Sequence, residues 1–464
     1  MQRIFDAFEK AGKELFLVGG AVRELARGID FELIDDLDFC TNARPQETLE
    51  ILRGAGLTIY DVGIEFGTVG TVLYSNTLAG YPKDCQITTY RSEEYYRRGS
   101  RHPQVSYGDT LEQDLKRRDF SINSIAMNAK GEYIDPYDGV GDLARGILRV
   151  VGDPHETLAE DPLRILRVGR FIAKLGFDAD DSLREACEQR ADCILEISRE
   201  RWLQEMTKLV MGAHAPCGLE FLRDVRILGN ILPEVAALSG VEASGRGERE
   251  DLWAQTMKIL LAAERTPVQR WAALLHLIGE PGVADDEAPR FERHEERGAA
   301  LSQGIAERFR FDNAMTRELR KLIEAHGLVL GYERGCADPD VRRLVRALDP
   351  YFEGHVALAR ATLEVVSDDE KRAGLEAICE LVDRAERLDA ADDLRPRHPR
   401  GLGKEVMTAF HLKPGPIIGQ IKDYLEEQML DGTLKNGAEA SLYIEHLRAQ
   451  MPDFLAKALG QDGE

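Results

Sequence analysis

The sequence predicts a multidomain protein with an α/β N-terminal head followed by an all-helical remainder. β-Branched and aromatic stretches, which favour strands, concentrate in residues 1–150. From about residue 155 the apolar residues recur with the 3.6-residue period of helices, between short Pro, Gly and Asp breaks. The length of 464 residues corresponds to about three domains at roughly 100–200 residues each.

The expected elements follow in chain order. An amphipathic segment with Ile4 and Phe8 precedes an apolar strand at residues 15–18, and a helix pattern comes after it. Further strands are expected around residues 37–41, 69–74, 86–90 and 105–107. Breaks near Asp153–Pro154, Ala215–Pro216, residues 281–289 and residues 389–399 suggest four parts: a head (1–150), a helical neck (151–215), a helical body (216–388) and a helical tail (389–464).

The composition excludes several classes of protein. Hydrophobic residues at 43% and charged residues at 31% indicate a globular chain rather than a disordered one. No apolar run approaches the roughly 18 residues of a membrane span, and the N-terminus lacks a secretory pattern. The seven cysteines are scattered and form no C-x-x-C pair, which favours free thiols and a cytoplasmic location.

The charge balance bears on nucleic-acid binding. The formal net charge is -22 and the pI about 5.0, which argues against a non-specific nucleic-acid binder because phosphate contacts need a positive surface. A protein with a local basic groove is still compatible with these values.

A glycine pair and an aspartate pair form the first candidate site. Gly19 and Gly20 follow a strand, so their backbone N–H groups can approach a phosphate, and Arg23 adds positive charge. Asp36 and Asp38 alternate along a strand, which puts both carboxylates on one face, where they can share divalent cations. An ordinary tight turn and an exposed acidic edge are the alternatives that these residues leave open.

A second candidate combines two arginines with an acid. Arg117, Arg118, Asp119 and Asn123 can together hold a triphosphate and a ribose, since Arg suits bidentate contacts with oxyanions. A solvated helix face with internal ion pairs fits the same residues.

A third candidate lies at a predicted helix start. Asp161 precedes Pro162 as a helix N-cap precedes proline at the first helical position. Arg164, Arg167 and Arg170 recur at every third position and give a basic stripe near the helix start.

In their order, these motifs resemble one known family. Asp36-x-Asp38-x-x-Thr41 and Thr89-Tyr-Arg91 stand between the glycine pair and the arginine-rich segments. The set closely resembles the class II tRNA nucleotidyltransferase and bacterial poly(A) polymerase family, whose catalytic head belongs to the polymerase-beta-like nucleotidyltransferase superfamily. The close resemblance covers about residues 15–215, and a weaker one continues to about residue 447.

The resemblance implies an enzyme that adds CCA to the 3′ end of tRNA from CTP and ATP and releases pyrophosphate. Asp36 and Asp38 would hold two Mg²⁺ ions. The residues implied at the triphosphate and ribose are Gly19, Gly20, Arg23, Arg118, Asp119 and Asn123. The residues implied in base recognition are Asp161, Arg164 and Arg167. An acid beside an arginine fits the exocyclic amine and ring nitrogen that cytosine and adenine both present.

Alternatives within and outside the family stay open. Residues 92–103 keep the full stretch in which the family has a flexible loop, which argues against an enzyme that adds only CC. Addition of A alone and poly(A) tailing are not separated from CCA addition by these motifs. Gln86 stands where the family usually has a third carboxylate, and Glu24 where Asp is common. Gln86 therefore also permits a catalytically weakened RNA-binding protein.

A second region resembles another domain found in some family members. Residues 249–298 are similar to an HD phosphohydrolase-like domain, which implies a metal site of histidines and aspartates. Leu277 stands at an aspartate position, and only His276 and His294 remain of the expected histidines. We therefore expect a helical scaffold without phosphohydrolase activity, and ordinary surface or core roles for the other histidines.

Overall fold

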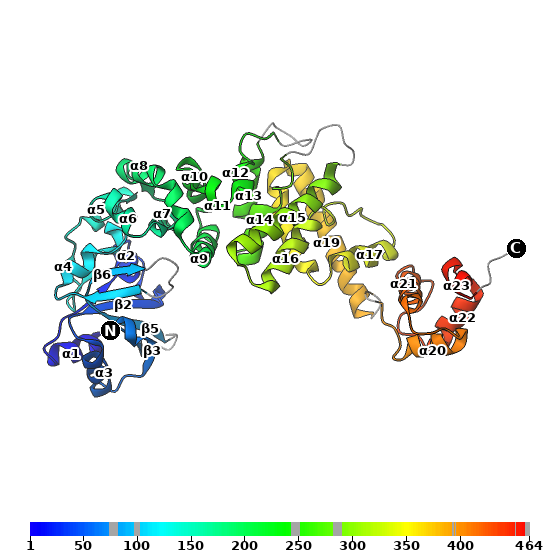
Figure 1. Cartoon of the computed structure of the whole chain (residues 1–464), viewed down its shortest axis with the longest axis horizontal. Helices are drawn as coiled ribbons and strands as arrows, with labels where there is room; N and C mark the ends of the chain where they lie inside the picture. The colour runs from blue at the N-terminus through cyan, green and yellow to red at the C-terminus, as the bar shows by residue number, and fades with distance from the viewer. Residues whose placement is uncertain are drawn as a thin grey trace. The chain divides into compact units, whose positions relative to one another are not determined.

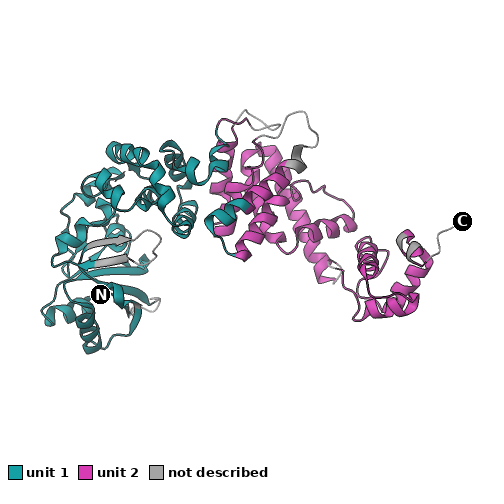
Figure 2. Cartoon of the chain, viewed as in Figure 1, with its two compact units in different colours: residues 1–239, 304–312 teal, residues 240–303, 313–464 magenta. Residues whose placement is uncertain are grey.

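A computed structural model describes residues 1–73, 82–96, 103–242, 251–281, 290–391, 394, 396–450 and 452–459. The chain forms two compact units, residues 1–239 with 304–312, and residues 240–303 with 313–464 (Figure 2). The predicted α/β head and helical remainder are confirmed (Figure 1). The loop residues Arg97, Arg98 and Arg101, residues 249–250 and Arg395 lie outside the described residues.

A seven-stranded mixed sheet forms the centre of the head. Its strands, in spatial order, are β3 (Ile59–Gly63), β4 (Thr68–Leu73), β5 (Lys83–Thr89), β2 (Asp36–Thr41), β1 (Leu15–Val18), β8 (Ala126–Met127) and β9 (Tyr133–Ile134). Only the β2–β5 pair is parallel within this described sheet; the other neighbours are antiparallel. The strands β6 (Arg91–Tyr96) and β7 (Pro103–Tyr107) form a separate hairpin sheet.

The side chains of β2 alternate between the hydrophobic core and the opposite face of the sheet. Leu37 and Phe39 are buried in one hydrophobic cluster with residues of α1 (Gln2–Lys10) and α3 (Pro45–Gly54). Asp36 and Asp38 alternate with them and are exposed. The core thus fixes which face of β2 presents the carboxylates.

The five predicted strands all form, with their described ends shifted by at most three residues, and Tyr74 lies outside the described residues. Five strands within residues 1–150 are additional: β3, β6, β8, β9 and β10 (Ile147–Leu148). β8 and β9 have two residues each, which is too short for an alternating pattern to show.

The first unit continues with helices, as predicted. They are α6 (Pro154–Glu160), α7 (Leu163–Leu175), α8 (Asp181–Gln189), α9 (Arg199–Val210), α10 (Ala215–Asp224), α11 (Ile227–Ile231) and α12 (Pro233–Ala236). Helices α7 and α10 pack closely because residue 218 is glycine. A Cβ atom at that position would lie only 2.5 Å from the carbonyl oxygen of Gly169. A two-residue parallel pair, β10 (Ile147–Leu148) with β11 (Asp178–Ala179), is the exception among these described helices.

The second unit is helical. Its main helices are α13 (Leu252–Ala262), α14 (Pro267–Leu275), α15 (Arg290–Phe309), α16 (Asn313–Glu324), α17 (Asp338–Leu348), α18 (Phe352–Thr362) and α19 (Asp368–Ala390). The last helices, α20 (Leu402–Phe410), α21 (Pro416–Leu430), α22 (Ala440–Gln450) and α23 (Asp453–Ala458), enclose a hydrophobic cluster of their own. Among the residues described, no helix has the length and apolar character needed to cross a membrane.

Candidate active site

The glycine turn meets one of the two aspartates at the end of β1. Val18 pairs with Asp38 across the β1–β2 ladder, and Gly19 directly follows Val18 as the N-cap of α2 (Gly20–Ala26). Gly19 has a φ of 69°, and a Cβ atom there would lie 3.3 Å from Arg118 Nη1 and 3.6 Å from Asp38 Oδ2. Three sequence motifs therefore converge at Gly19, where glycine leaves space for a ligand to approach.

Opposing charges act on the carboxylates of this site. Although the Asp38 side chain is accessible to solvent, the protein that surrounds it displaces much of its water, and this desolvation raises its pKa. Arg118 lowers the pKa of Asp38, and the neighbouring Asp36 raises it. On the adjacent parallel strand, Gln86 pairs with Asp38 and Asp84 pairs with Asp36. The position beside Asp38 thus carries a neutral amide, and a cation at this edge would relieve the repulsion between the aspartates.

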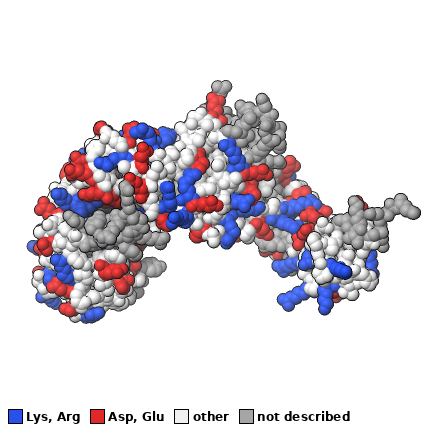
Figure 3. Space-filling view, in the orientation of Figure 1, with Lys and Arg blue, Asp and Glu red and all other residues white. Residues whose placement is uncertain are grey.

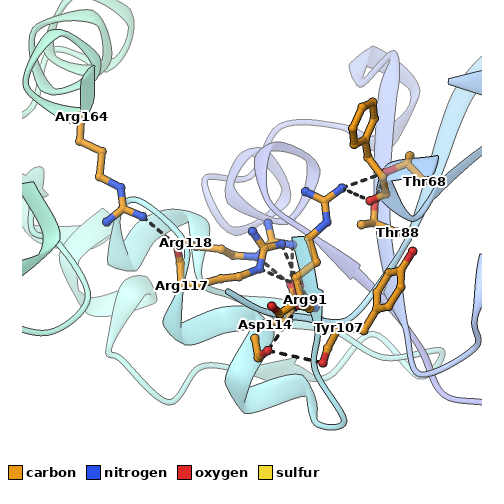
Figure 4. A network of polar contacts seen from close by, with 11 residues as sticks. Thr68, Thr88, Arg91, Tyr107, Asp114, Arg117, Arg118 and Arg164 are labelled. Atoms are coloured by element: carbon orange, nitrogen blue, oxygen red, sulfur yellow. Dashed lines mark hydrogen bonds and ion pairs between the residues drawn. The ribbon is translucent and has the colours of Figure 1, made fainter. Parts of the chain in front are cut away.

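A buried aspartate that the sequence analysis did not single out holds the two adjacent arginines (Figure 4). Asp114, in α4 (Leu111–Lys116), is 1% exposed and accepts from Arg117 at 2.9 Å and from Arg118 at 3.0 Å. It also accepts from the backbone N–H of Arg91 at 3.2 Å. Burial alone would raise the pKa of Asp114, but the two arginines lower it below its usual value. This carboxylate orients Arg118 toward Gly19 and Asp38.

A second network links the glycine-turn arginine to the helical neck. Arg23 is buried and donates to Oδ1 of Asn123, whose Nδ2 donates to Asp119 at 2.8 Å. Asp119 forms an ion pair with Arg167 of α7. Burial raises the pKa of Asp119, yet Arg167 and Asn123 bring it below its usual value. Four predicted site residues are therefore joined in one hydrogen-bonded chain.

A pocket of about 790 Å³ brings the second and third motifs together. Its lining includes Arg117, Arg118, Asp119, Asp161, Arg164, Arg167 and Arg201. Arg164 donates to the backbone oxygens of Thr157 at 3.0 Å and Arg117 at 3.1 Å (Figure 4). The three predicted base-recognition residues, Asp161, Arg164 and Arg167, thus line the same cavity as the predicted ribose-binding segment.

Asp161 lies one position earlier than a helix N-cap. Helix α7 begins at Leu163 with Pro162 as its N-cap, so the predicted helix start is wrong by one residue. The Asp161 side chain nevertheless accepts from the backbone N–H of Leu163 at 3.2 Å. Its other oxygen accepts from Arg201 at 2.8 Å. Arg201 lies on α9, about 40 positions along the chain, and no local sequence pattern linked it to Asp161.

Comparisons with known proteins identify the family. A model of the "Poly A polymerase head domain" matches residues 15–149, and one described as "Probable RNA and SrmB- binding site of polymerase A" matches residues 176–238. A CCA-adding enzyme of Streptococcus suis is 31% identical over 441 residues, covering 94% of this chain and 93% of the relative. One of Lactobacillus delbrueckii subsp. bulgaricus is 38% identical over 439 residues, covering 94% of each.

The chain belongs to the CCA-adding enzyme family. A crystal structure of the Bacillus stearothermophilus CCA-adding enzyme in complex with CTP covers 97% of both chains at 25% identity, with a TM-score of 0.64. The predicted family and nucleotidyltransferase fold are confirmed. Catalysis in the CCA-adding enzyme family depends on a divalent metal, and Asp36 and Asp38 are the exposed carboxylate pair on the face of β2 opposite the core that fits such an ion.

Three histidines of the second unit, His276, His294 and His326, form one buried cluster. A buried position in the core is one of the ordinary roles expected for His326. His326 follows His294 by 32 positions, and the fold of α15 and α16 brings the two together.

Proposed function

We propose that this chain adds CCA to the 3′ end of tRNA, taking CTP and ATP and releasing pyrophosphate. The observation that carries the proposal is the meeting of Asp38, Gly19 and Arg118 at one edge of the sheet, next to the pocket that holds Asp161 and Arg164. A metal-binding edge and a base-reading pocket in one unit are what templateless nucleotide addition needs. The similarity to CCA-adding enzymes over nearly the whole chain supports the same conclusion.

The metal that we propose at Asp36 and Asp38 is Mg²⁺. Two exposed carboxylates on one strand face offer the hard oxygen ligands that Mg²⁺ prefers, and Asp38 gains from a neighbouring cation. When bound, the metal lowers the pKa of the RNA 3′-hydroxyl and offsets the charge of the triphosphate and leaving pyrophosphate. Gly19, Gly20 and Arg118 would position the phosphates beside it.

The proposed base selection follows from hydrogen-bond chemistry. An Asp161 carboxylate accepts from the exocyclic amine of cytosine or adenine, and Arg164 donates to the adjacent ring nitrogen. Uracil and guanine present a carbonyl where the amine would be, and an unpaired carboxylate facing it costs about 1–3 kcal/mol. Asp119 and Asn123 would face the ribose, and Arg167, the third residue that we assign to base recognition, forms an ion pair with Asp119.

We assign tRNA binding to the helical body (216–388) and tail (389–464), and base recognition to the neck (151–215). Residues 176–238 match an RNA-binding model, which supports tRNA binding by the start of the body. All seven cysteines are free, which supports a reducing compartment, and we propose the cytoplasm.

Nucleotide incorporation assays test the function. The chain is incubated with tRNA that ends before CCA and, separately, with tRNA that ends in CC, each with CTP, ATP or both. We expect two C additions with CTP alone, one A on the CC end with ATP, and complete CCA with both. Addition only to the CC end would identify an A-adding enzyme, and long A tails a poly(A) polymerase. An Asp36→Ala variant is the matched control; absent incorporation in both chains would identify a pseudo-enzyme.

A further inference from the structure

The strand beside the two aspartates carries a lysine on its apolar face. Along β5, Cys85 and Ile87 are fully buried in the hydrophobic cluster of the head, while Asp84 is exposed on the other face. Strand alternation places Lys83 on the same face as the first two, and it is only 7% exposed. A lysine is almost never this buried unless its charge is paired or hydrogen-bonded, so the partners of Lys83 need an explanation.

One short turn accepts all the hydrogen bonds of this ammonium group. Lys83 Nζ donates to the backbone oxygens of Phe31 at 3.1 Å, Glu32 at 3.0 Å and Ile34 at 2.7 Å. Three N–H donors thus meet three carbonyl acceptors, and the Phe31 ring centroid lies 5.1 Å from Nζ. The turn is the 3-10 helix η1 (Phe31–Leu33), with Ile34 as its C-cap. Carbonyl oxygens at a helix C-terminus lack partners within the helix, so a lysine is a suitable donor there.

Apolar packing buries little of this turn. Leu33 is 74% exposed and Phe31 is partly buried, whereas Ile34 lies in the hydrophobic cluster of the head. The bonds from Lys83 tie the turn to β5, which is 49 to 52 positions further along the chain. β2 begins with Asp36, two residues after Ile34. The lysine therefore fixes the chain directly before the first aspartate.

The sheet holds the two aspartates to different extents. Asp38 is paired on both sides, with Val18 of β1 and with Gln86 of β5. Asp36 is paired with Asp84 of β5, but the ladder between β1 and β2 ends at Asp38. The position of Asp36 thus depends more than that of Asp38 on the segment that precedes it.

We propose that Lys83 is a positioning residue for the metal site, acting through the turn at residues 31–34 on the carboxylate of Asp36. This inference rests on the proposed Mg²⁺ site at Asp36 and Asp38. Lys83 stands on the face of the sheet opposite these carboxylates, so its role is indirect. Three bonds from one buried group restrain the turn in three directions, which an apolar side chain at the same position does not do.

Metal binding to the full chain tests this role with a readout that does not require catalysis. Mn²⁺ is the probe, and electron paramagnetic resonance measures the free ion. The Asp36→Ala/Asp38→Ala variant gives the background from other sites. We expect Lys83→Met to weaken Mn²⁺ binding at the head about 10–100-fold, since a metal ligand loses its support. Lys130→Met, on an exposed turn between β8 and β9, is the matched control and should bind as wild type does.

Double variants distinguish positioning from a general loss of stability. If Lys83 acts through Asp36, Lys83→Met should have no effect in the Asp36→Ala background and should keep its effect in the Asp38→Ala background. Incorporation of CTP gives a second comparison. The kcat should fall about 10–100-fold and recover in part with excess Mg²⁺. The KM for CTP should change little, because Asp161 and Arg164 are untouched.

Lys83→Arg covers the case in which Lys83→Met does not fold. It keeps the charge but has a planar fork in place of three diverging donors, so it should retain the fold and only part of the Mn²⁺ affinity. Unchanged Mn²⁺ affinity in folded Lys83→Met, or in Lys83→Arg where Lys83→Met does not fold, would overturn the role of Lys83. The same loss in the Asp36→Ala background would also overturn it. Wild type that binds Mn²⁺ no better than the Asp36→Ala/Asp38→Ala variant would overturn the proposed metal site itself, and this inference with it.

Discussion

At the residue scale, Arg201 holds the carboxylate that we assign to base recognition. Its Nη2 donates to Asp161 at 2.8 Å, and both side chains line the pocket of the second and third motifs. We predict that Arg201→Ala lowers kcat/KM for both CTP and ATP about tenfold, the loss of one charge-assisted hydrogen bond. Arg201→Lys should recover part of it.

Selectivity among the four nucleotides distinguishes the role of Asp161 from that of Arg201. Asp161→Ala should relax discrimination against UTP and GTP, whereas Arg201→Ala should lower rates and keep most of the discrimination. Incorporation assays with the four nucleotides, one at a time, give both quantities. A chain with Asp161→Ala that still selects CTP and ATP would contradict the assignment of Asp161.

Asp114 carries a second residue-scale prediction. It is buried between Arg117 and Arg118, and breaking such a pair costs about 3–5 kcal/mol. Asp114→Asn should therefore lower the denaturant midpoint of the first unit and raise KM for the nucleotides, because Arg118 loses its orientation.

The pH dependence of this loss has a definite sign. The folded state lowers the pKa of Asp114, so its ionised carboxylate stabilises the fold above the ordinary aspartate pKa. The contribution disappears as the pH falls through the folded-state value. The difference in stability between wild type and Asp114→Asn should thus be full at pH 7 and shrink in strong acid. A difference that grows on acidification would contradict the ion-pair explanation.

Residue identity alone could predict only part of the site. Asp36, Asp38 and Gly19 were predictable because strand alternation and a glycine turn are local patterns. Asp114 was not, since a helical acid before two arginines looks like a solvated face until its burial is known. Arg201 and His326 were not predictable because tertiary packing brings them to their partners.

At the scale of elements, the parallel pairing of β2 with β5 sets the chemistry of the metal edge. Its register puts Gln86 beside Asp38. We predict that Gln86→Glu lowers the Mg²⁺ concentration for half-maximal incorporation about three- to tenfold, because a charged ligand replaces a neutral amide. Gln86→Ala is the control and should need at least as much Mg²⁺ as wild type. Titrating Mg²⁺ in CTP incorporation assays compares the three chains. If Gln86→Glu needs the same Mg²⁺ concentration as wild type, residue 86 does not contribute to metal binding.

The elements themselves were predictable where their patterns are long. β1, β2, β4 and β5 are four to seven residues long, and each contains β-branched or aromatic residues. β6 contains Arg-Ser-Glu-Glu, which has weak strand propensity, and pairs only through its β7 partner. Helix α15 starts in the second unit, but residues 304–312 belong to the first unit. The local sequence did not predict this division, because it depends on tertiary packing such as the contact of Phe309 with Trp202.

At the scale of the whole molecule, the net charge of -22 limits the electrostatic contribution to RNA binding. Basic and acidic side chains are interspersed over the visible face (Figure 3). Within the first unit, arginines near the pocket have acidic partners: Arg164 with Glu160, Arg167 with Asp119, Arg170 with Glu205 and Arg201 with Asp161. Guanidiniums that are already paired with carboxylates neutralise few RNA phosphates, so few counterions leave the RNA when it binds.

We therefore predict a shallow salt dependence for tRNA binding. Fewer than about six phosphate contacts correspond to a slope of log K against log salt no steeper than about -5. Fluorescence anisotropy with labelled tRNA between 50 and 200 mM KCl measures the slope, and duplex DNA of similar length is the control. We expect much weaker binding to the DNA at every salt concentration, because recognition would then rest on the acceptor end rather than on charge. A steep slope with equal affinity for tRNA and DNA would contradict this prediction. It would mean that phosphates replace the described acidic partners of the arginines, and that charge rather than shape determines which nucleic acid binds.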